Sequence, residues 1–507
     1  MLNITIMSRI SSDLKNKEFS YRDITLIPYR LPDFEREEVD LSSYFTKKIK
    51  INTPLVSSPM DTVTESKMAI LLAVFGGIGV IHYNFLTIEE QIEEVKKVKK
   101  FKTVFIKDPI CLSPTSKIKD VYKIKEKYGF SSVPITENGK INSKLLGMVT
   151  ERHIRYQDDK EISLRRIMTK TKELIMVPRK ETLDKNDIEA VNKLIKKYNL
   201  DILPIIDENL NLVALVTDSD LEKNRKWPLA TKDKNKQLRV FIAVEARLEL
   251  AKERIKKGKE AGVDGIVIDA GIVYKEQLEI AKFTKKNFPH IEVVIGNICS
   301  PKMVREIMKK ASSYVDALRI GVGPGAACIT QEELGVGRLQ ASALWNCTQE
   351  VKKLRKKYGF MPLIADGGIK ILENSSENFG RVADITKALS LGASTIMIGS
   401  IFAGLDEAPG EKIYDEKNER MVKKYRGMGS YEAMEKRAGV RYKIDKVKIK
   451  VAEGKEIKVP YRGSGYDFLP NLIAGIKQSF QKQGFRNIPE LQKYGEIKPF
   501  KNSYCKI

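Results

Sequence analysis

The chain has 507 residues, enough for two or three hydrophobic cores, because a single core seldom grows beyond roughly 250 to 300 residues. Hydrophobic residues make up 42% of it. No window approaches the roughly 20 uninterrupted apolar residues of a membrane helix, so we expect no membrane segment. The formal net charge is +24, but the lysines are spread along the chain, which favours a solvated surface over a dedicated nucleic-acid site.

The ends of the chain and its cysteines indicate a reducing compartment. The amino-terminal residues lack the apolar core and cleavage site of a secretory signal, so we expect a cytoplasmic protein. The cysteines are odd in number, widely spaced and never in a C-x-x-C pair, which argues against a disulfide framework and against a zinc site. They are Cys111, Cys299, Cys328, Cys347 and Cys505.

Eight short apolar runs that end in small or polar residues predict the strands of a closed barrel. They are residues 54–60, 79–82, 240–244, 265–270, 293–297, 317–321, 362–367 and 395–400. Most precede a helix-like stretch, such as 248–261, 301–311 or 384–391, which is the alternation of parallel β/α units. Parallel strands are buried on both faces and therefore read as continuous apolar runs. We predict an α/β fold, an eight-stranded (β/α) TIM barrel, with its chemistry after the carboxyl ends of the strands.

The interval between the second and third runs contains an imperfect repeat. VPIT and LLGMVTERHI, within 133–154, correspond to LPII and LVALVTDSDL, within 203–221, and an apolar-periodic helix precedes each pair. This resembles a tandem pair of cystathionine-β-synthase (CBS) repeats, which implies binding of adenine or guanine nucleotides, with Asp218 and Asp220 near the ribose. The alternative is a structural insertion without a ligand. The predicted domains are residues 1–107 and 231–507 for the barrel and 108–230 for the insertion.

A long connection follows the eighth run. Residues 425–442, YRGMGSYEAMEKRAGVRY, contain glycine and many charges, and long loops in compact domains are usually functional or disordered. We predict a mobile flap over about residues 412–460.

The segment GVGPGAACIT, residues 321–330, begins at the last residue of the sixth run. Its three glycines allow positive φ and close approach of the backbone to a ligand. Backbone dipoles in such a loop favour the thiolate form of a cysteine, so Cys328 is a candidate nucleophile. By itself, a cysteine beside glycines is more often a buried small hydrophobic residue.

The neighbouring motifs favour the nucleophile. The pattern G-x-G-x-G-x-x-C-x-T, filled here by Gly321, Gly323, Gly325, Cys328 and Thr330, resembles the cysteine loop of the IMP dehydrogenase and GMP reductase superfamily. The resemblance runs through nearly the whole chain. Further matching segments are VSSPMDTVTESKMAI (56–70), GGIGVIHYN (76–84), DALRIGVGPG (316–325), IADGGI (364–369), GASTIMIGS (392–400), EAPGE (407–411) and KKYRGMGS (423–430).

The resemblance implies a binding site for inosine 5′-monophosphate (IMP). The matching positions are Ser58, Met60, Asp366, Gly368, Gly399, Ser400, Tyr425, Gly427, Met428, Gly429 and Glu453. Asp366 would hold the ribose, because a carboxylate can accept from two hydroxyl groups, and the glycine-containing ends of the last two strands would hold the phosphate. Glu453 suits a purine ring that presents an N–H donor.

The resemblance also implies a reaction. Cys328 would add to carbon 2 of the hypoxanthine, hydride would pass to NAD⁺, and the flap pair Arg441 and Tyr442, assisted by Thr330, would activate the water that releases xanthosine 5′-monophosphate. The cofactor-binding positions would be Asp269, Asn297, Arg319, Gly321 and Gly323. Backbone carbonyls of Gly323, Gly325 and Cys328 would hold a potassium ion. The implied assembly is a homotetramer, with octamers formed through the inserted repeats.

Two alternatives stay open. An NADPH-dependent GMP reductase shares the barrel and the cysteine loop but needs no hydrolytic flap. The Arg441–Tyr442 pair and GRLQ, residues 337–340, favour the dehydrogenase. The second alternative is a catalytically impaired purine-nucleotide sensor, and the joint presence of Cys328, Thr330 and Arg441 argues against it.

Three departures from the family pattern concern mainly the cofactor side. After the fourth run, Ala270 and Gly271 stand where hydroxyl residues are usual, and Glu245, in the segment 241–249, stands where a small residue is usual. Ala326 replaces a serine that helps to bind phosphate, which removes a hydrogen bond worth only about 0.5 to 1.5 kcal/mol. The first two changes place the NAD⁺ site in doubt.

Overall fold

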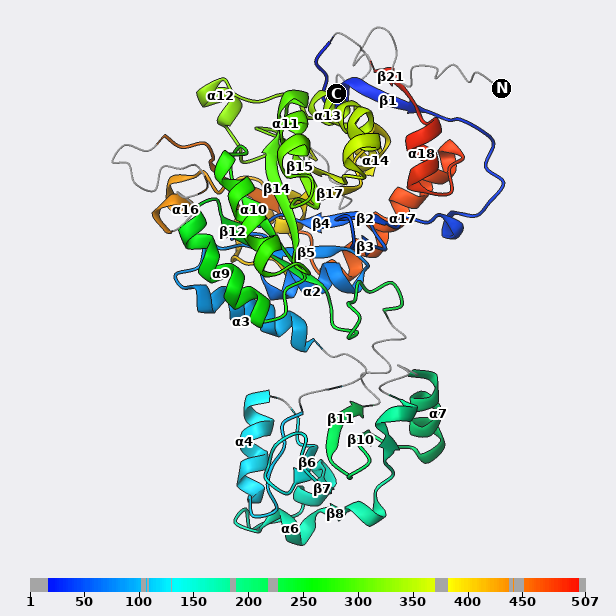
Figure 1. Cartoon of the computed structure of the whole chain (residues 1–507), viewed down its shortest axis with the longest axis vertical. Coiled ribbons are helices and arrows are strands. Elements are labelled where there is room, and N and C mark those ends of the chain that lie inside the picture. Colours follow the sequence, from blue (N-terminus) through cyan, green and yellow to red (C-terminus); the bar gives the residue numbers. More distant parts are fainter. Residues whose placement is uncertain are drawn as a thin grey trace. The chain divides into compact units, whose positions relative to one another are not determined.

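The computed structural model describes most of the chain as two compact units (Figure 1). The described residues are 17–101, 106, 109–128, 130–182, 188–217, 227–369, 382–436, 441 and 451–500. The larger unit takes Met1–Phe101, Leu229–Asp233 and Leu238–Ile507, and the smaller takes Lys102–Pro228 and Lys234–Gln237. Among the described residues, no helix is long and apolar enough to cross a bilayer.

The larger unit is built on a closed eight-stranded parallel barrel, as predicted. Its strands are β4 (Leu55–Ser57), β5 (Ile78–Ile81), β12 (Val240–Glu245), β13 (Gly265–Asp269), β14 (Glu292–Ile298), β15 (Ala317–Ile320), β16 (Leu363–Asp366) and β17 (Thr395–Ile398). Each overlaps one of the eight predicted runs, and β5, β12 and β14 extend beyond their runs by one residue at one or both ends. The sheet closes because β17 pairs with β4, and β5 pairs with β12 across the point where the smaller unit is inserted.

Side chains fill the barrel at its amino-terminal end. Val56, Val80, Ala317 and Ile364 belong to one buried cluster, together with Phe45 from the hairpin of β2 (Ser43–Tyr44) and β3 (Lys50–Ile51). The rings of Phe45 and Phe241 meet edge to face at 4.8 Å. With this end occupied by apolar packing, the open end of the barrel is the one formed by the carboxyl ends of the strands.

Helices alternate with the strands and cover the barrel. They are α2 (Ser66–Val74), α3 (Ile88–Lys100), α9 (Leu248–Glu260), α10 (Lys275–Asn287), α11 (Pro301–Ala311), α12 (Thr330–Leu334), α13 (Gln340–Tyr358), α14 (Val382–Leu391) and α15 (Ser400–Ala403), followed by α17 (Gly465–Gln483) and α18 (Ile488–Tyr494). α11 shows why the sequence predicts them well. Ser300 caps its first turn, Pro301 occupies its first position, and Val304, Ile307, Met308 and Ala311 form the buried face.

The predicted flap range is not one continuous loop. β18 (Lys412–Asp415), β19 (Arg420–Arg426) and β20 (Glu456–Pro460) form an antiparallel sheet, and α16 (Tyr431–Lys436) follows β19. The ends of the range 412–460 are therefore regular structure, because β19 and β20 supply backbone hydrogen-bond partners to each other. A further antiparallel pair, β1 (Ile24–Ile27) with β21 (Glu496–Pro499), joins the two ends of the larger unit.

The smaller unit contains the sequence repeat as two similar halves. The first has α4 (Ile118–Tyr128), β6 (Val133–Thr136), β7 (Leu145–Val149), α5 (Glu151–Ile154), α6 (Leu164–Ile167) and β8 (Thr169–Lys170), and the second has β9 (Val177–Pro178), α7 (Ile188–Tyr198), β10 (Ile202–Ile206) and β11 (Leu212–Thr217). Both contain a helix followed by an antiparallel strand pair, and each pair packs in its own apolar cluster. Asp218 and Asp220 lie outside the described residues.

Candidate active site

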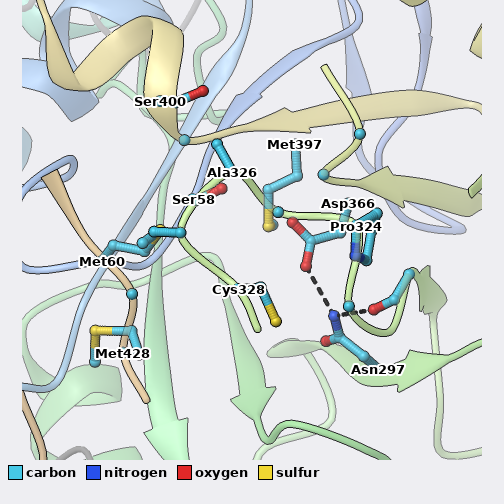
Figure 2. A pocket seen from close by; sticks show the side chains of 18 of the residues that line it. Ser58, Met60, Asn297, Pro324, Ala326, Cys328, Asp366, Met397, Ser400 and Met428 are labelled. Atoms are coloured by element: carbon cyan, nitrogen blue, oxygen red, sulfur yellow. Dashed lines mark hydrogen bonds between the residues drawn. The ribbon is translucent and has the colours of Figure 1, made fainter. Parts of the chain in front are cut away.

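A cavity that is partly open to solvent lies at the carboxyl ends of the barrel strands. Most of the residues selected from the sequence line it, although they come from distant segments. They are Ser58, Met60, Asn297, Arg319, Gly321, Gly323, Gly325, Cys328, Thr330, Asp366, Gly368, Gly399, Ser400, Tyr425, Gly427, Met428, Arg441 and Glu453. In Figure 2, Met60 and Met428 lie on one side of Cys328, and Asn297 and Asp366 lie on the other.

Three selected residues stand apart from the lining. Asp269 is fully buried and does not line the cavity. Its carboxylate pairs with Arg319 and Arg441, which do. The carbonyl of Gly429 accepts hydrogen bonds from the amides of Glu453 and Gly454, at 3.0 and 3.2 Å. Tyr442 lies outside the described residues.

Sequence reasoning also missed several lining residues, among them Pro59, Pro324, Met397 and Ile398. Met397 and Ile398 lie within the apolar run of β17, where the pattern indicates only a buried strand. Pro59 and Pro324 each lie between two residues that the sequence predicted for the site. Their position in the sequence was therefore the only indication that they line the cavity.

Cys328 is the first member of a short polar chain. Its Sγ lies 3.2 Å from Oγ1 of Thr330, and that hydroxyl donates to Oε2 of Glu453 at 2.9 Å. Burial raises the pKa of Glu453, although the hydrogen bond from Thr330 opposes this by stabilising the charged form. A proton can therefore pass between the space beside the thiol and a carboxylate whose affinity for protons is increased.

The cysteine loop rests on the segment that precedes β20. The Ile329 amide donates to the Glu453 carbonyl at 3.0 Å, and the Lys455 amide donates to the Ala327 carbonyl at 3.0 Å. Gly427 packs against the same place, since a Cβ there would lie 2.6 Å from the carbonyl oxygen of Ala327. The position of the thiol thus depends on residues about a hundred positions further along the chain.

Alternating buried charges connect two sides of the cavity. Nε of Arg319 donates to Oδ2 of Asp366 at 2.7 Å, and its Nη1 donates to Oδ1 of Asp269 at 2.8 Å. Asp269 also forms an ion pair with Arg441. Burial would raise the pKa of Asp269, but the guanidinium groups of Arg441 and Arg319 outweigh this and hold it below its ordinary value. The carboxylate assigned to the cofactor and the arginine assigned to water activation are therefore in direct contact.

Asn297 joins this network to the cysteine loop. Its Nδ2 donates to Oδ2 of Asp366 at 2.9 Å and to the carbonyl of Gly321 at 2.5 Å (Figure 2). Within the described part of the chain, Oδ1 of Asn297 and Oδ2 of Asp269 are buried acceptors without a hydrogen-bond partner. Buried acceptors usually have partners, so this side of the cavity suits a ligand with N–H or O–H donors.

Small residues and an aromatic ring form the opposite end of the cavity. Ser400 begins the short helix α15, and Gly399 precedes it at the end of β17. A Cβ at Gly399 would lie only 2.6 Å from the hydroxyl of Tyr425, so the ring needs a glycine there. Tyr425 is buried and its hydroxyl contacts Sδ of Met60 at 3.4 Å, while burial raises its pKa and keeps the phenol neutral.

Comparison with known proteins decides the family. The model described as "IMP dehydrogenase / GMP reductase domain" matches residues 18–504. The chain belongs to this family of oxidoreductases. Curated inosine-5′-monophosphate dehydrogenases from Toxoplasma gondii and Schizosaccharomyces pombe are 43% and 39% identical, over 83% and 93% of this chain and 71% and 86% of their own. A crystal structure of a GMP reductase from Trypanosoma brucei, in complex with guanosine 5′-monophosphate, has a TM-score of 0.83 at 27% identity and covers 97% of both chains.

Within this IMP dehydrogenase / GMP reductase fold, Glu245 has a local partner. Its carboxylate accepts two hydrogen bonds from Arg254 of α9, at 2.7 and 2.6 Å, and Arg254 also donates to Gln91 at 2.7 Å. All three side chains are buried. The unusual glutamate is thus neutralised inside the barrel wall by Arg254, so it does not bring an uncompensated charge to the cofactor side.

The change at Gly271 has a different consequence. Gly271 lines the cavity, and its amide donates to the carbonyl of Arg441 at 3.2 Å. A glycine lets the backbone of another segment approach closely. The loss of a hydroxyl after β13 is therefore accompanied by direct backbone contact with the segment that carries Arg441.

Proposed function

We propose that this protein is an NAD-dependent IMP dehydrogenase that oxidises IMP to xanthosine 5′-monophosphate, the committed step of guanine nucleotide synthesis. The observation that carries the proposal is one cavity that holds both Cys328, with its Thr330–Glu453 chain, and Arg441. A thiol nucleophile and a separate group for water activation are the two requirements of covalent oxidation followed by hydrolysis. The relatives named above as dehydrogenases support the same reading.

IMP would lie across the cavity with its phosphate at the end of β17. The amides and hydroxyl around Gly368, Gly399 and Ser400, with Tyr425, offer donors for the phosphate oxygens. Asp366 would accept the ribose hydroxyls, since Asn297 and Arg319 both donate to its Oδ2, which leaves Oδ1 for the substrate. Met60 and Met428 supply apolar contact for the purine, and Glu453 faces its N–H groups.

The residues on the β13–β15 side fit a nicotinamide dinucleotide. Oδ1 of Asn297, a buried acceptor in the cavity wall, suits a carboxamide N–H, and Oδ2 of Asp269 would accept from a ribose hydroxyl once Arg441 moves away. Arg319, Gly321 and Gly323 line the same side or hold it in place. When bound, the dinucleotide accepts the hydride from carbon 2 of the purine.

The chemistry then divides between two sets of residues. The Cys328 thiolate bonds to carbon 2, and the same carbon loses hydride, which leaves a covalent nucleotide on sulfur. Water then attacks carbon 2 and the carbon–sulfur bond breaks, so the thiolate leaves. The water proton passes through the Thr330 hydroxyl to Glu453, or to the Arg441–Tyr442 pair, which requires Arg441 in its neutral form and away from Asp269. Because Arg441 pairs with Asp269, the arginine and the dinucleotide compete for one carboxylate, which orders the two stages.

A potassium ion would be held by carbonyls of the cysteine loop. The donors would be Gly323, Gly325 and Cys328, and carbonyl oxygens suit a large, weakly hydrated cation. Gly323 has φ +86° and no room for a Cβ, which would lie 2.4 Å from Cγ of Gln331. The loop is therefore wound tightly enough to bring backbone groups together.

The smaller unit would be a tandem CBS pair, at residues 108–230, that binds regulatory adenine or guanine nucleotides. Its two helix–strand–strand halves support this. Homotetramers, octamers formed through the repeats and a cytoplasmic location complete the proposal by analogy with the family.

NADH formation tests the function directly. Purified protein is given IMP, NAD⁺ and potassium, beside a Cys328→Ala variant. We expect the parent to form NADH and xanthosine 5′-monophosphate and the variant to form neither while still binding IMP, because the alanine removes the nucleophile and leaves the nucleotide contacts. Oxidation of NADPH by the parent with GMP would indicate the reductase instead, a reading favoured by the similarity to GMP reductase structures. IMP binding without either reaction would indicate the sensor.

A further inference from the structure

Asp61 and Arg426 form an ion pair beside the cavity but do not line it. Nε of Arg426 donates to Oδ1 of Asp61 at 3.1 Å and Nη2 donates to Oδ2 at 2.5 Å, so the guanidinium holds the carboxylate with both arms. Asn84 adds a third donor to Oδ2 at 2.8 Å. Asp61 is 4% and Arg426 19% exposed, so water screens the pair only weakly.

Each member of the pair is next to residues that face the cavity. Asp61 directly follows Met60, after the end of β4, and Arg426 is the last residue of β19, directly before Gly427 and Met428. The two residues are 365 positions apart in sequence. The pair therefore ties the barrel wall to the antiparallel sheet β18–β20 at the place where both contribute to the cavity.

The same point leads to the cysteine loop. The amide of Gly427 donates to the carbonyl of Lys455 at 3.1 Å, and the amide of Lys455 donates to the carbonyl of Ala327 at 3.0 Å. A shift of Arg426 would move Gly427, and through Lys455 it would move the support of Cys328. The path consists of one peptide bond and two hydrogen bonds.

We infer that Asp61 and Arg426 are positioning residues that set the spacing between the nucleotide-binding strand ends and the Cys328 loop, and so determine affinity for a purine nucleoside monophosphate. The inference rests on the proposed function for the identity of the nucleotide. Neither side chain contacts the cavity, so the effect acts through Met60 and Gly427.

Stability alone is a weak reason for such a pair. Removing two charges from water costs several kcal/mol per ion before their attraction is counted, and apolar residues of similar volume often stabilise a fold as well or better. A bidentate pair with a third donor does, however, fix distance and orientation. These are the properties that the walls of a binding site require.

The experiment compares nucleotide affinity with fold stability. The variants are Arg426→Gln, Arg426→Lys, Asp61→Asn and the double variant Asp61→Asn/Arg426→Gln. The matched control is Arg239→Gln, which breaks another partly buried pair, with Asp264 at 2.8 Å, at the amino-terminal end of β12. IMP affinity is measured by calorimetry, stability by thermal melting, and the placement of Cys328 by its rate of alkylation with iodoacetamide.

We expect Arg426→Gln to raise the Kd for IMP by at least about tenfold, because a charge-assisted bidentate contact is lost, and to change the alkylation rate. Arg426→Lys should lie between this variant and the parent. In the double variant stability should recover, since no buried charge is left unpaired, but affinity should stay low. Arg239→Gln should melt earlier and bind IMP like the parent.

Normal IMP affinity in Arg426→Gln, with a melting temperature lowered as in the control, would overturn the inference and leave the pair a structural one. Recovery of affinity together with stability in the double variant would overturn it as well. If the parent itself binds no IMP, the proposed function fails and the inference with it. If only the inference about Asp61 and Arg426 is wrong, the parent and the variants instead bind IMP equally well.

Discussion

At Glu453, partial burial and one hydrogen bond act in opposite directions on the same carboxyl group. Burial raises its pKa, and the Thr330 hydroxyl lowers it less strongly. A carboxylate that accepts a proton from water must be ionised, and one with a raised pKa accepts that proton more readily. The environment of Glu453 therefore suits a base rather than a purely structural residue.

The pH dependence of kcat should report the ionisation of the Glu453 carboxyl group. Because the pKa of Glu453 is raised, kcat at saturating IMP should start to fall, on acidification, at a higher pH than an ordinary glutamate would cause. Glu453→Gln should remove this acid limb and lower kcat by at least about tenfold, a modest effect for a general base. Glu432→Gln, an exposed glutamate on α16, is the control. A Glu453→Gln profile that matches the parent would exclude the role.

Asp269 and Arg441 show how one residue pair can link two stages of a reaction. The family resemblance assigns the aspartate to the cofactor and the arginine to hydrolysis, and the structure puts them in contact. Since the pKa of Asp269 is held below its ordinary value, it is charged at neutral pH and the pair is intact there. The ion-pair contribution to stability is present above the ordinary carboxyl pKa and is lost as the pH falls through the lower, folded value.

Among the elements, the cysteine loop depends most on glycine. Gly321 has φ +145°, and a Cβ there would lie 2.2 Å from the carbonyl oxygen of Asp366 at the end of β16. Two strand ends thus touch at a point where no side chain fits. The glycines allow the nucleophile loop and the ribose carboxylate to lie side by side.

Gly321→Ala should lower both stability and NADH formation, because the new methyl group must push β16 and the cysteine loop apart. Gly359→Ala is the matched control, since Gly359 has φ +82° but no atom within 4 Å of the added carbon. The control should lose only the stability that its glycine-favoured backbone conformation costs an alanine, about 1 to 3 kcal/mol, and keep full activity. Melting temperature and NADH rate separate the two effects. Equal activities in the two variants would show that the close contact is unimportant.

At the scale of the molecule, two units have separate hydrophobic cores. The barrel core contains Val56, Ile78 and Phe241, and the smaller unit packs around other residues, such as Ile118, Val191 and Leu212. The chain leaves the barrel after α3 and returns before β12. An insertion with its own core can be removed without opening the core of its host.

Replacing residues 102–228 by a flexible glycine–serine linker should leave a barrel that folds and forms NADH. The melting transition should stay close to that of the parent, because the buried cluster of the barrel consists of residues of the larger unit. Any response of the NADH rate to added adenine or guanine nucleotides should disappear. Calorimetric melting and the NADH assay test this beside the full chain. An insoluble or inactive product would show that the barrel requires the smaller unit.

The sequence by itself determined the elements and the composition of much of the candidate site. The eight strands overlap the predicted apolar runs because both faces of a barrel strand are buried, and α11 follows its capping and apolar pattern residue by residue. Asp366 ends β16, and Cys328 and Thr330 lie in the loop after β15, at the end of the barrel where the chemistry comes together. These signals are local, so a single sequence contains them.

Only the tertiary structure decided which charges meet. Glu245 with Arg254, Asp269 with Arg441, and Asp61 with Arg426 leave no periodic signal, because nothing near one partner in sequence specifies the other. Closure of the barrel and docking of the β18–β20 sheet bring them together, and burial then makes each pairing necessary, since a buried charge without a partner is costly. The departures at the end of β12 and after β13 thus became a neutralised glutamate and a close backbone contact once the fold was formed.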